Sequence, residues 1–226
     1  QSTIMSTNAS TENDLNWREA VLAGVKVSIS EPPTTDGVPS QGVTFLLTGA
    51  MIPEREYKST REVLCLEQHQ TVIGIFINVL TTAHAWYAER IPVVYQAYIL
   101  QEEQKKEKSS STTANNAKNR FNVVGHSVGA KISLLVAATA KSKASNDEKD
   151  TSPQIERVLA LDPVDLNPSV FTSQRTTPLS LKGTPAHTIL VTWADASSSW
   201  SIPPAHNASA IFDEIQKEPP MTNKKA

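Results

Sequence analysis

The chain has 226 residues, of which 39% are hydrophobic, and its formal net charge is −2 at pH 7. This length is enough for one domain with a sizeable core, and the near-neutral charge gives no electrostatic reason to expect nucleic acid or an anionic membrane as a partner. The single cysteine, Cys65, excludes a disulfide within the chain. No apolar run reaches the length that a stable membrane span needs.

The composition divides the chain into three segments. Residues 1–15 are polar and rich in Ser, Thr and Asn, so we expect them to be disordered. Residues 16–217 carry the apolar runs and are expected to form one domain. Residues 218–226 form a charged, proline-containing tail.

The first half of the chain predicts three strands and a helix. Val25–Ser30 alternates apolar and polar residues, which predicts a half-exposed strand. Gly42–Gly49 and Thr71–Asn78 are continuous apolar runs, typical of strands buried on both faces. Residues 88–104 have helical spacing after a break expected at Pro92.

The second half continues the alternation of strands and helices. Two polar inserts, Lys105–Arg120 and Ser142–Gln154, are expected to be exposed, poorly ordered loops. The expected elements are a strand at Phe121–Gly125, a helix from about Val128 to Lys141, strands at Ile155–Asp162 and His187–Asp195, and a short amphipathic helix at Asn207–Lys217. Short apolar strands that alternate with helices predict an α/β fold, with a mainly parallel sheet covered by helices on both faces.

A serine lies between two glycines where a predicted strand becomes a helix, in the sequence Gly125-His126-Ser127-Val128-Gly129. Gly-x-Ser-x-Gly in this position is typical of a nucleophile elbow, a sharp turn that lifts the serine above the carboxyl edge of the sheet. The helix that follows offers backbone N–H groups, including that of Val128, to an oxyanion. Ser127 is therefore a candidate nucleophile; the alternative is a glycine-rich strand–helix turn without chemistry.

The second oxyanion donor is expected in the loop after the strand at residues 42–48. Gly49 lets the chain turn there, and the N–H of Ala50 or Met51 is the candidate donor. The alternative is that this segment is simply the end of a strand.

Three carboxylates follow later strands and meet the position that a triad acid requires, namely Asp162, Asp165 and Asp195. We favour Asp162, because Pro163 stiffens the turn after it and favours an extended conformation at Asp162 itself. Asp165 and Asp195 remain alternatives.

Several segments together resemble chlorophyllases and their lipase-like α/β-hydrolase relatives, over roughly residues 25–217. The similar segments are GVTFLLTGAMIPEREYKSTREVL, VVGHSVGAKISLLVAA, VLALDPVD, ILVTWAD and PPAHNASAIFDEI. The elbow is common to all α/β-hydrolases, whereas Leu-Asp-Pro-Val-Asp is much narrower. The family's elbow usually reads Gly-His-Ser-Arg-Gly-Gly-Lys, and its oxyanion loop His-Gly. Here Val128 and Ala130 depart from the elbow pattern, and Thr48-Gly49 departs from the loop.

The resemblance implies an α/β-hydrolase fold with Ser127 as nucleophile and Asp162 as acid. It implies hydrolysis of a hydrophobic ester through an acyl-enzyme, with release of phytol from chlorophyll, without a metal or other cofactor and in a plastid. The departures bear on the chlorophyll substrate more than on the hydrolase class. The alternatives are a lipase or carboxylesterase acting on acyl lipids, and a catalytically silent protein of this fold that binds a hydrophobic ligand.

The sequence offers five histidines for the base that a serine triad needs. His126 is expected to be structural, His69 and His84 to be exposed, and His187 to lie at the wrong edge of the sheet. His206 is the positional candidate for the base. In the resembled family, however, the base follows one further strand, and we expect that strand and its histidine to be missing here.

Overall fold

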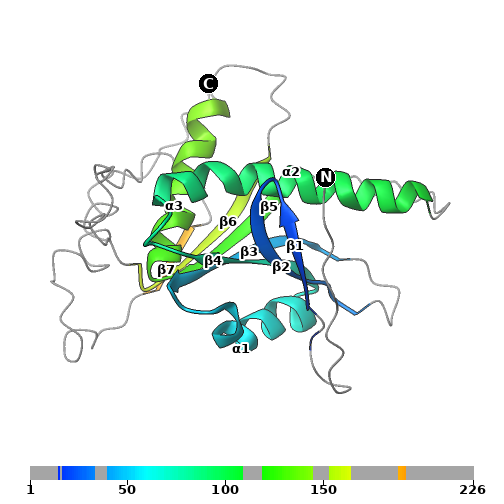
Figure 1. The fold of residues 1–226 in the computed structure, drawn as a ribbon, viewed down its shortest axis with the longest axis horizontal. Helices are drawn as coiled ribbons and strands as arrows, with labels where there is room; N and C mark the ends of the chain where they lie inside the picture. Colours follow the sequence, from blue (N-terminus) through cyan, green and yellow to red (C-terminus); the bar gives the residue numbers. More distant parts are fainter. Residues whose placement is uncertain are drawn as a thin grey trace, which may run out of the picture.

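The computed structural model describes residues 15, 17–33, 40–108, 119–144, 153–163 and 188–191. Within these ranges, seven strands form one sheet (Figure 1). The strands are β1 (Trp17–Leu22), β2 (Val25–Ser30), β3 (Gly42–Ala50), β4 (Gln70–Ile77), β5 (Arg120–His126), β6 (Gln154–Leu161) and β7 (Thr188–Val191). The helices are the 3-10 turn η1 (Glu54–Tyr57), α1 (Lys58–Glu62), the π-helical turn η2 (Val63–Glu67), α2 (His84–Lys108) and α3 (Val128–Ala144).

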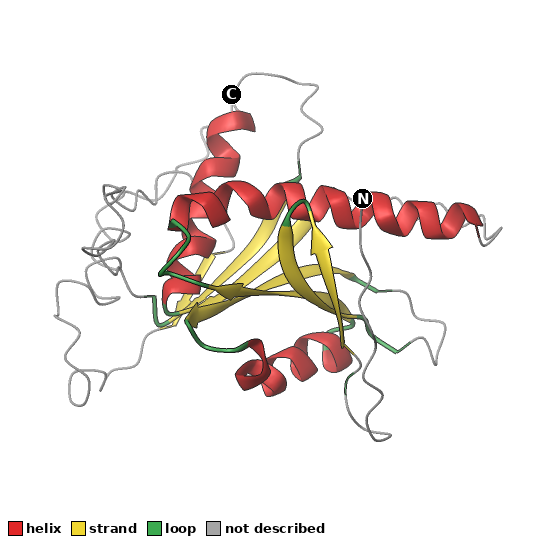
Figure 2. Ribbon diagram, viewed as in Figure 1, coloured by secondary structure: helices red, strands yellow, loops and turns green. Residues whose placement is uncertain are grey.

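The sheet is mixed, and its parallel part carries the candidate nucleophile. Its strand order is β1-β2-β4-β3-β5-β6-β7. β1 and β2 form an antiparallel hairpin, β2 is antiparallel to β4, and all strands from β4 to β7 are parallel. Figure 2 shows α1 on one face and α2 and α3 on the other. The mixed sheet has helices on both faces, and β5 leads through Gly-x-Ser-x-Gly into a helix. This arrangement is the α/β-hydrolase fold, as predicted.

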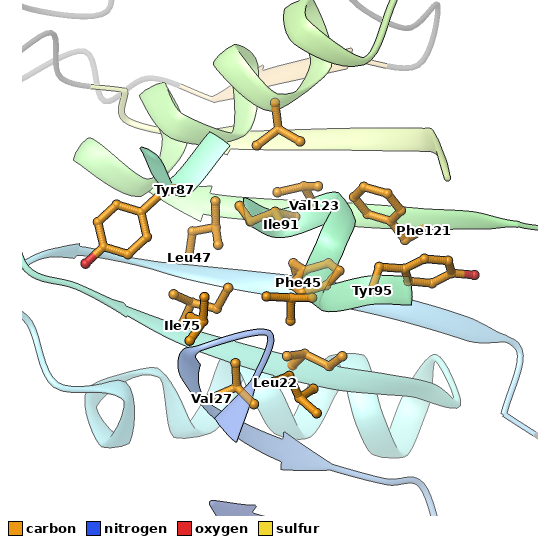
Figure 3. Packing of buried hydrophobic residues seen from close by; sticks show 14 of the residues in the cluster. Leu22, Val27, Phe45, Leu47, Ile75, Tyr87, Ile91, Tyr95, Phe121 and Val123 are labelled. Carbon is orange, nitrogen blue, oxygen red and sulfur yellow. The ribbon is translucent and has the colours of Figure 1, made fainter. Parts of the chain in front are cut away.

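The main core lies between the sheet and the layer formed by α2 and α3. Alternate residues of the central strands point into it, among them Phe45, Ile75 and Val123, and they meet Ile91 and Tyr95 of α2 (Figure 3). Alternation is the side-chain period of a strand, so the residues between these face the other layer. There, a smaller cluster joins Leu46, Val72 and Val124 to Cys65 of η2.

Cys65 is fully buried in this smaller cluster. Burial, which disfavours the charged thiolate, raises the pKa of its thiol to about 11, although the nearby Arg61 opposes the shift.

α2 differs from its prediction in two respects. α2 begins at His84 and continues through Pro92, so the predicted break there is wrong. Pro92 cannot donate to the carbonyl of Ala88, but the buried Ile91 and Tyr95 on either side keep this stretch packed on the sheet. α2 also extends to Lys108, which makes the start of the first predicted loop helical.

Only parts of the other polar segments lie within the described residues. α3 runs to Ala144 and takes in the first three residues of the second predicted loop. The rest of that loop lies outside the described residues, except for its last two positions. Residues 109–118 of the first loop, residues 1–14, the predicted helix Asn207–Lys217 and the tail also lie outside them.

β2 is more buried than the alternating pattern predicted, since only Lys26 in this strand is exposed. The reason is a polar cluster that covers Ser28 and Ser30 on the α1 side of the sheet. Arg61 of α1 donates to both hydroxyls, at 3.0 Å to Ser30 and 2.7 Å to Ser28, and to the carboxylate of Glu54 at 2.9 Å. Ser28 also bonds to Glu54.

The cluster is a buried ion pair, and its groups come from three elements: Arg61 from α1, Glu54 from η1 and the two serines from β2. Only 6% of the Arg61 side chain and 14% of the Glu54 side chain are exposed. Burial raises the pKa of Glu54 and lowers that of Arg61, and the attraction between the two opposes both shifts. Gly74 of β4 makes room for the cluster, because a Cβ there would lie 2.3 Å from the guanidinium of Arg61. The cluster thus fastens η1 and α1 to the sheet.

Replacing Arg61 by methionine should lower the free energy of unfolding by about 3–5 kcal/mol, because the carboxylate of Glu54 would stay buried without its partner. Urea denaturation measures this. Arg55→Met is the matched control: Arg55 lies in the same segment, but 76% of its side chain is exposed, so its loss should cost less than about 0.5 kcal/mol. Equal effects of the two substitutions would contradict a stabilising role for the cluster.

Candidate active site

Ser127 occupies the single turn position between the end of β5 and the start of α3. Its φ angle is +55°, a left-handed conformation that costs a residue with a side chain roughly 1–2 kcal/mol. Backbone bonds hold it there: its N–H donates to the carbonyl of Leu161 at 2.9 Å, and its carbonyl accepts from the N–H groups of Ala130 and Lys131. The predicted position of Ser127, at the carboxyl end of a central strand with unusual backbone angles, is confirmed.

The two glycines of the motif allow the turn to be this tight. A Cβ at Gly125 would lie 2.3 Å from the carbonyl oxygen of Gly129, and a Cβ at Gly129 would lie 2.4 Å from the carbonyl oxygen of Leu47. Both contacts are with backbone, which cannot rotate away as a side chain would. α3 can therefore approach β5 and β3 this closely only where these positions have no side chain.

The loop after β3 offers one of its two predicted oxyanion donors. The N–H of Met51 donates to the carbonyl of Ile77 at 3.0 Å, so the expectation that Met51 is a free donor is wrong. Ala50 pairs with Ile77 in the β3–β4 ladder. The N–H of Ala50, just beyond a register shift between Leu47 and Ala50 in that ladder, remains the candidate donor from this loop.

Val128 is the candidate for the second donor. It is the first residue of α3, and the first N–H groups of a helix have no acceptor within it. The positive end of the helix dipole also lies there. Ala50 and Val128 thus remain the two candidate donors, one at the end of β3 and one at the start of α3.

Asp162 directly follows β6, the strand beside β5. Its φ angle is +46°, so the extended conformation predicted from Pro163 is wrong. Aspartate tolerates the left-handed region better than most residues, and its N–H is held by the carbonyl of Val191 at 2.7 Å. Asp162 lies near enough to His126 for its charge to act on that ring. The alternatives Asp165 and Asp195 lie outside the described residues.

The described histidines are three of the five. The Nδ1 atom of His126 lies 2.8 Å from the hydroxyl of Tyr57, and burial lowers the pKa of its ring, with the charge of Asp162 opposing the shift. His69 and His84 are half-buried, so the expectation that they are exposed is wrong. His69 precedes β4 at the amino edge of the sheet, and one ring nitrogen is buried there. His187 and His206 lie outside the described residues.

Tyr57 is a site residue that the sequence did not single out. Its hydroxyl accepts a hydrogen bond from the N–H of Gly49 at 2.7 Å as well as contacting His126. Burial raises the pKa of this hydroxyl, which keeps it protonated. Nothing in the sequence marks a tyrosine eight residues after Gly49, because its role depends on how the loop folds back on the elbow.

Two hollows adjoin these elements. One of about 340 Å³ is lined by residues of η1, α1, β3, β5 and β6, and its polar side chains are those of Glu56, Tyr57, Thr60 and His126. The other, of about 460 Å³, lies by the end of β4 and the start of α2. Its aromatic lining comprises Trp17, Phe76, Trp86 and Tyr87, and its charged lining comprises Glu19, Lys26, Glu54 and Arg55.

The described residues contain no group of three or more His, Cys, Asp or Glu side chains that could hold a metal ion. Within the same ranges, no helix combines the length and apolarity needed to cross a membrane.

No protein-family model and no curated protein matches the sequence. Similar solved structures include an esterase/lipase from an uncultured bacterium, with 14% identity and a TM-score of 0.42 over 69% of this chain and 46% of that one. Another is a fluorophosphonate-binding serine hydrolase F of Staphylococcus aureus, with 14% identity and a TM-score of 0.39 over 81% and 65%. A third is a thermostable esterase from Pseudomonas putida, with 15% identity and a TM-score of 0.40 over 76% and 46%.

The chain spans about half the length of the first and third of these structures and less than two thirds of the second. The reaction must therefore be inferred from the residues of the site itself.

Replacing Gly125 or Gly129 by alanine should lower the free energy of unfolding by about 3 kcal/mol, the upper range for overpacking, because the clash is with backbone. Thermal and urea denaturation measure this. Gly24→Asn is the control: Gly24 also has a positive φ, +80°, but a Cβ there meets nothing within 4 Å, and asparagine tolerates that φ. The explanation fails if Gly125→Ala is as stable as Gly24→Asn.

Proposed function

We propose that the protein is a serine ester hydrolase that works through an acyl-enzyme on Ser127. The observation that carries the proposal is the left-handed turn at Ser127, between a central parallel strand and a helix N-terminus. Such strain persists only where the surroundings enforce it, and here it presents a hydroxyl beside helix N–H groups. An ester carbonyl that enters this position meets a nucleophile and oxyanion donors together.

The proposed reaction assigns a role to each group. The hydroxyl oxygen of Ser127 attacks the ester carbonyl carbon, and a general base takes its proton. The N–H groups of Ala50 and Val128 stabilise the oxyanion that forms. The alcohol leaves with the proton, and water then releases the acid by the same steps. His206 remains the positional candidate for the base, and Asp162 the carboxylate that orients it.

The substrate is proposed to be an ester with a large apolar group. The aromatic hollow beside β4 could receive that group: β4 is separated from β5 only by β3, and strands are spaced by about 4.8 Å, which puts the end of β4 roughly 10 Å from that of β5. The Leu-Asp-Pro-Val-Asp segment resembles chlorophyllases, so chlorophyll with its phytyl ester is the finer proposal. Acyl lipids are the alternative within the same class.

A fluorophosphonate probe should label the protein at Ser127 within minutes, because only an activated serine reacts quickly. Mass spectrometry of the labelled peptide identifies the residue. Ser127→Ala should abolish labelling, and heat-denatured protein should not react. Ser133→Ala is the matched control, because Ser133 is fully buried in α3 and donates to the carbonyl of Ala130. Absence of labelling at Ser127 in folded protein would favour the catalytically silent alternative.

Replacing Trp86 by alanine should raise the KM for chlorophyll or for a long-chain p-nitrophenyl ester by about 10-fold, and leave the KM for p-nitrophenyl acetate unchanged. Trp86 lines the aromatic hollow, and loss of a buried aromatic contact worth about 1.4 kcal/mol weakens binding tenfold. A wild-type preference for chlorophyll over the long-chain ester would support the finer proposal. Equal changes for the long and short esters would contradict the hollow as the apolar subsite.

A further inference from the structure

One hydroxyl group joins the two halves of the proposed oxyanion hole. Tyr57, the last residue of η1, accepts a hydrogen bond from the N–H of Gly49 at 2.7 Å, and its oxygen lies 2.8 Å from Nδ1 of His126. Gly49 immediately precedes the donor Ala50, and His126 immediately precedes Ser127. The side chain of Tyr57 therefore ties the loop after β3 to the elbow by a second route, in addition to the β3–β5 ladder.

A backbone N–H can only donate, so the Tyr57 oxygen accepts from Gly49. The hydroxyl has one proton and a second lone pair, so the direction of its bond to Nδ1 of His126 follows the tautomer of the ring. The hydroxyl donates to Nδ1 when the neutral ring carries its proton on Nε2, and it accepts when Nδ1 is protonated.

The backbone at Gly49 is shaped for this contact. A Cβ there would lie 3.2 Å from the Tyr57 hydroxyl, 3.2 Å from Nδ1 of His126 and 2.7 Å from the side chain of Ile52. A side chain at position 49 would therefore occupy the space in which the Tyr57 hydroxyl, the His126 ring and the Ile52 side chain meet.

We propose that Tyr57 is a positioning residue, whose hydroxyl sets the distance between the oxyanion donors Ala50 and Val128. The proposal rests on the proposed function. A donor in the loop after β3 is otherwise fixed by the bond of Met51 to Ile77, on the side away from the elbow. The hydrogen bonds of Tyr57 to Gly49 and His126, together called the Tyr57 bridge, hold the loop on the side that faces the elbow. A displacement of the loop on that side would move the N–H of Ala50 relative to the proposed oxyanion.

The bridge also makes the position of the loop depend on pH. Among the described residues, the ionisable groups near His126 are Tyr57 from η1, Asp162 after β6, and Glu56, which lines the same hollow. Burial lowers the pKa of His126 below its usual value of about 6.5, and Asp162 opposes the shift. In the neutral ring with its proton on Nε2, Nδ1 accepts from Tyr57. In the protonated ring Nδ1 donates to the Tyr57 oxygen instead, so the bond reverses and the hydroxyl must turn its own proton elsewhere. We expect this change of geometry to lower the labelling rate of Ser127 toward acid.

The test is the rate of fluorophosphonate labelling at Ser127 in Tyr57→Phe. The maximal labelling rate should fall about 10- to 100-fold, as expected for misplacement of an oxyanion donor, and the probe concentration at half-maximal rate should change less than twofold. Tyr95→Phe is the matched control, since that hydroxyl bonds to the carbonyl of Arg120 at the far end of β5. Equal losses in both variants would overturn the positioning role.

Substitutions of His126 separate positioning from general stability. His126→Asn keeps an acceptor near the place of Nδ1 but cannot titrate in this range. It should label faster than His126→Leu and lose the part of the acid limb that His126 contributes. If His126→Leu labels as fast as the wild type, with an unchanged pH profile, the bridge does not act on the site.

The bridge can be tested even if Ser127 proves unreactive, which would refute the proposed function alone. In Tyr57→Phe, hydrogen exchange of the Gly49 amide should become faster, because its acceptor is gone. The titration midpoint of His126, measured by NMR, should shift, because the ring loses its hydrogen-bond partner at Nδ1. Unchanged exchange and an unchanged midpoint would overturn the bridge itself.

Discussion

The site depends on a backbone contact between α3 and the two central strands β3 and β5. Only Ser127 separates the end of β5 from the start of α3. The helix lies so close to the sheet that a Cβ at Gly125 or Gly129 would collide with backbone atoms. This contact forces the left-handed turn at Ser127 and aims the first N–H groups of α3 at the same point. The positions of the proposed nucleophile and of one of its two proposed oxyanion donors thus have one steric origin.

The sequence predicted the features that are encoded locally. Continuous apolar runs located β3 to β6 to within one residue, and the Gly-x-Ser-x-Gly spacing located the elbow. Gly125 is required by a contact with Gly129, four residues away, whereas Gly129 is required by a contact with Leu47 of β3 that the spacing does not show. The prediction failed where distant segments decide the outcome. The burial of Ser28 depends on Arg61 of α1, and the use of the Met51 N–H depends on a carbonyl of β4.

β1 and the short helices after β3 were missed for a related reason, whereas β2 was predicted. Trp17–Leu22 carries two adjacent charged residues, Arg18 and Glu19, which form ion pairs with Glu102 of α2 and Lys26 of β2. η1 and α1 expose most of their surface and are held by the pair Arg61–Glu54 rather than by an apolar stripe. Periodicity detects apolar faces, so elements fixed by polar contacts between distant residues give it little signal.

The burial of the one cysteine has a practical consequence for the study of this protein. Its thiol lies under η2, against β3, β4 and β5, and both its burial and its raised pKa protect it from alkylation in the folded state. Its modification by iodoacetamide would therefore report each opening of the layer formed by α1 and η2. The rate of alkylation of Cys65 would thus measure how often this layer unfolds locally, on the face of the sheet where Tyr57 contacts His126.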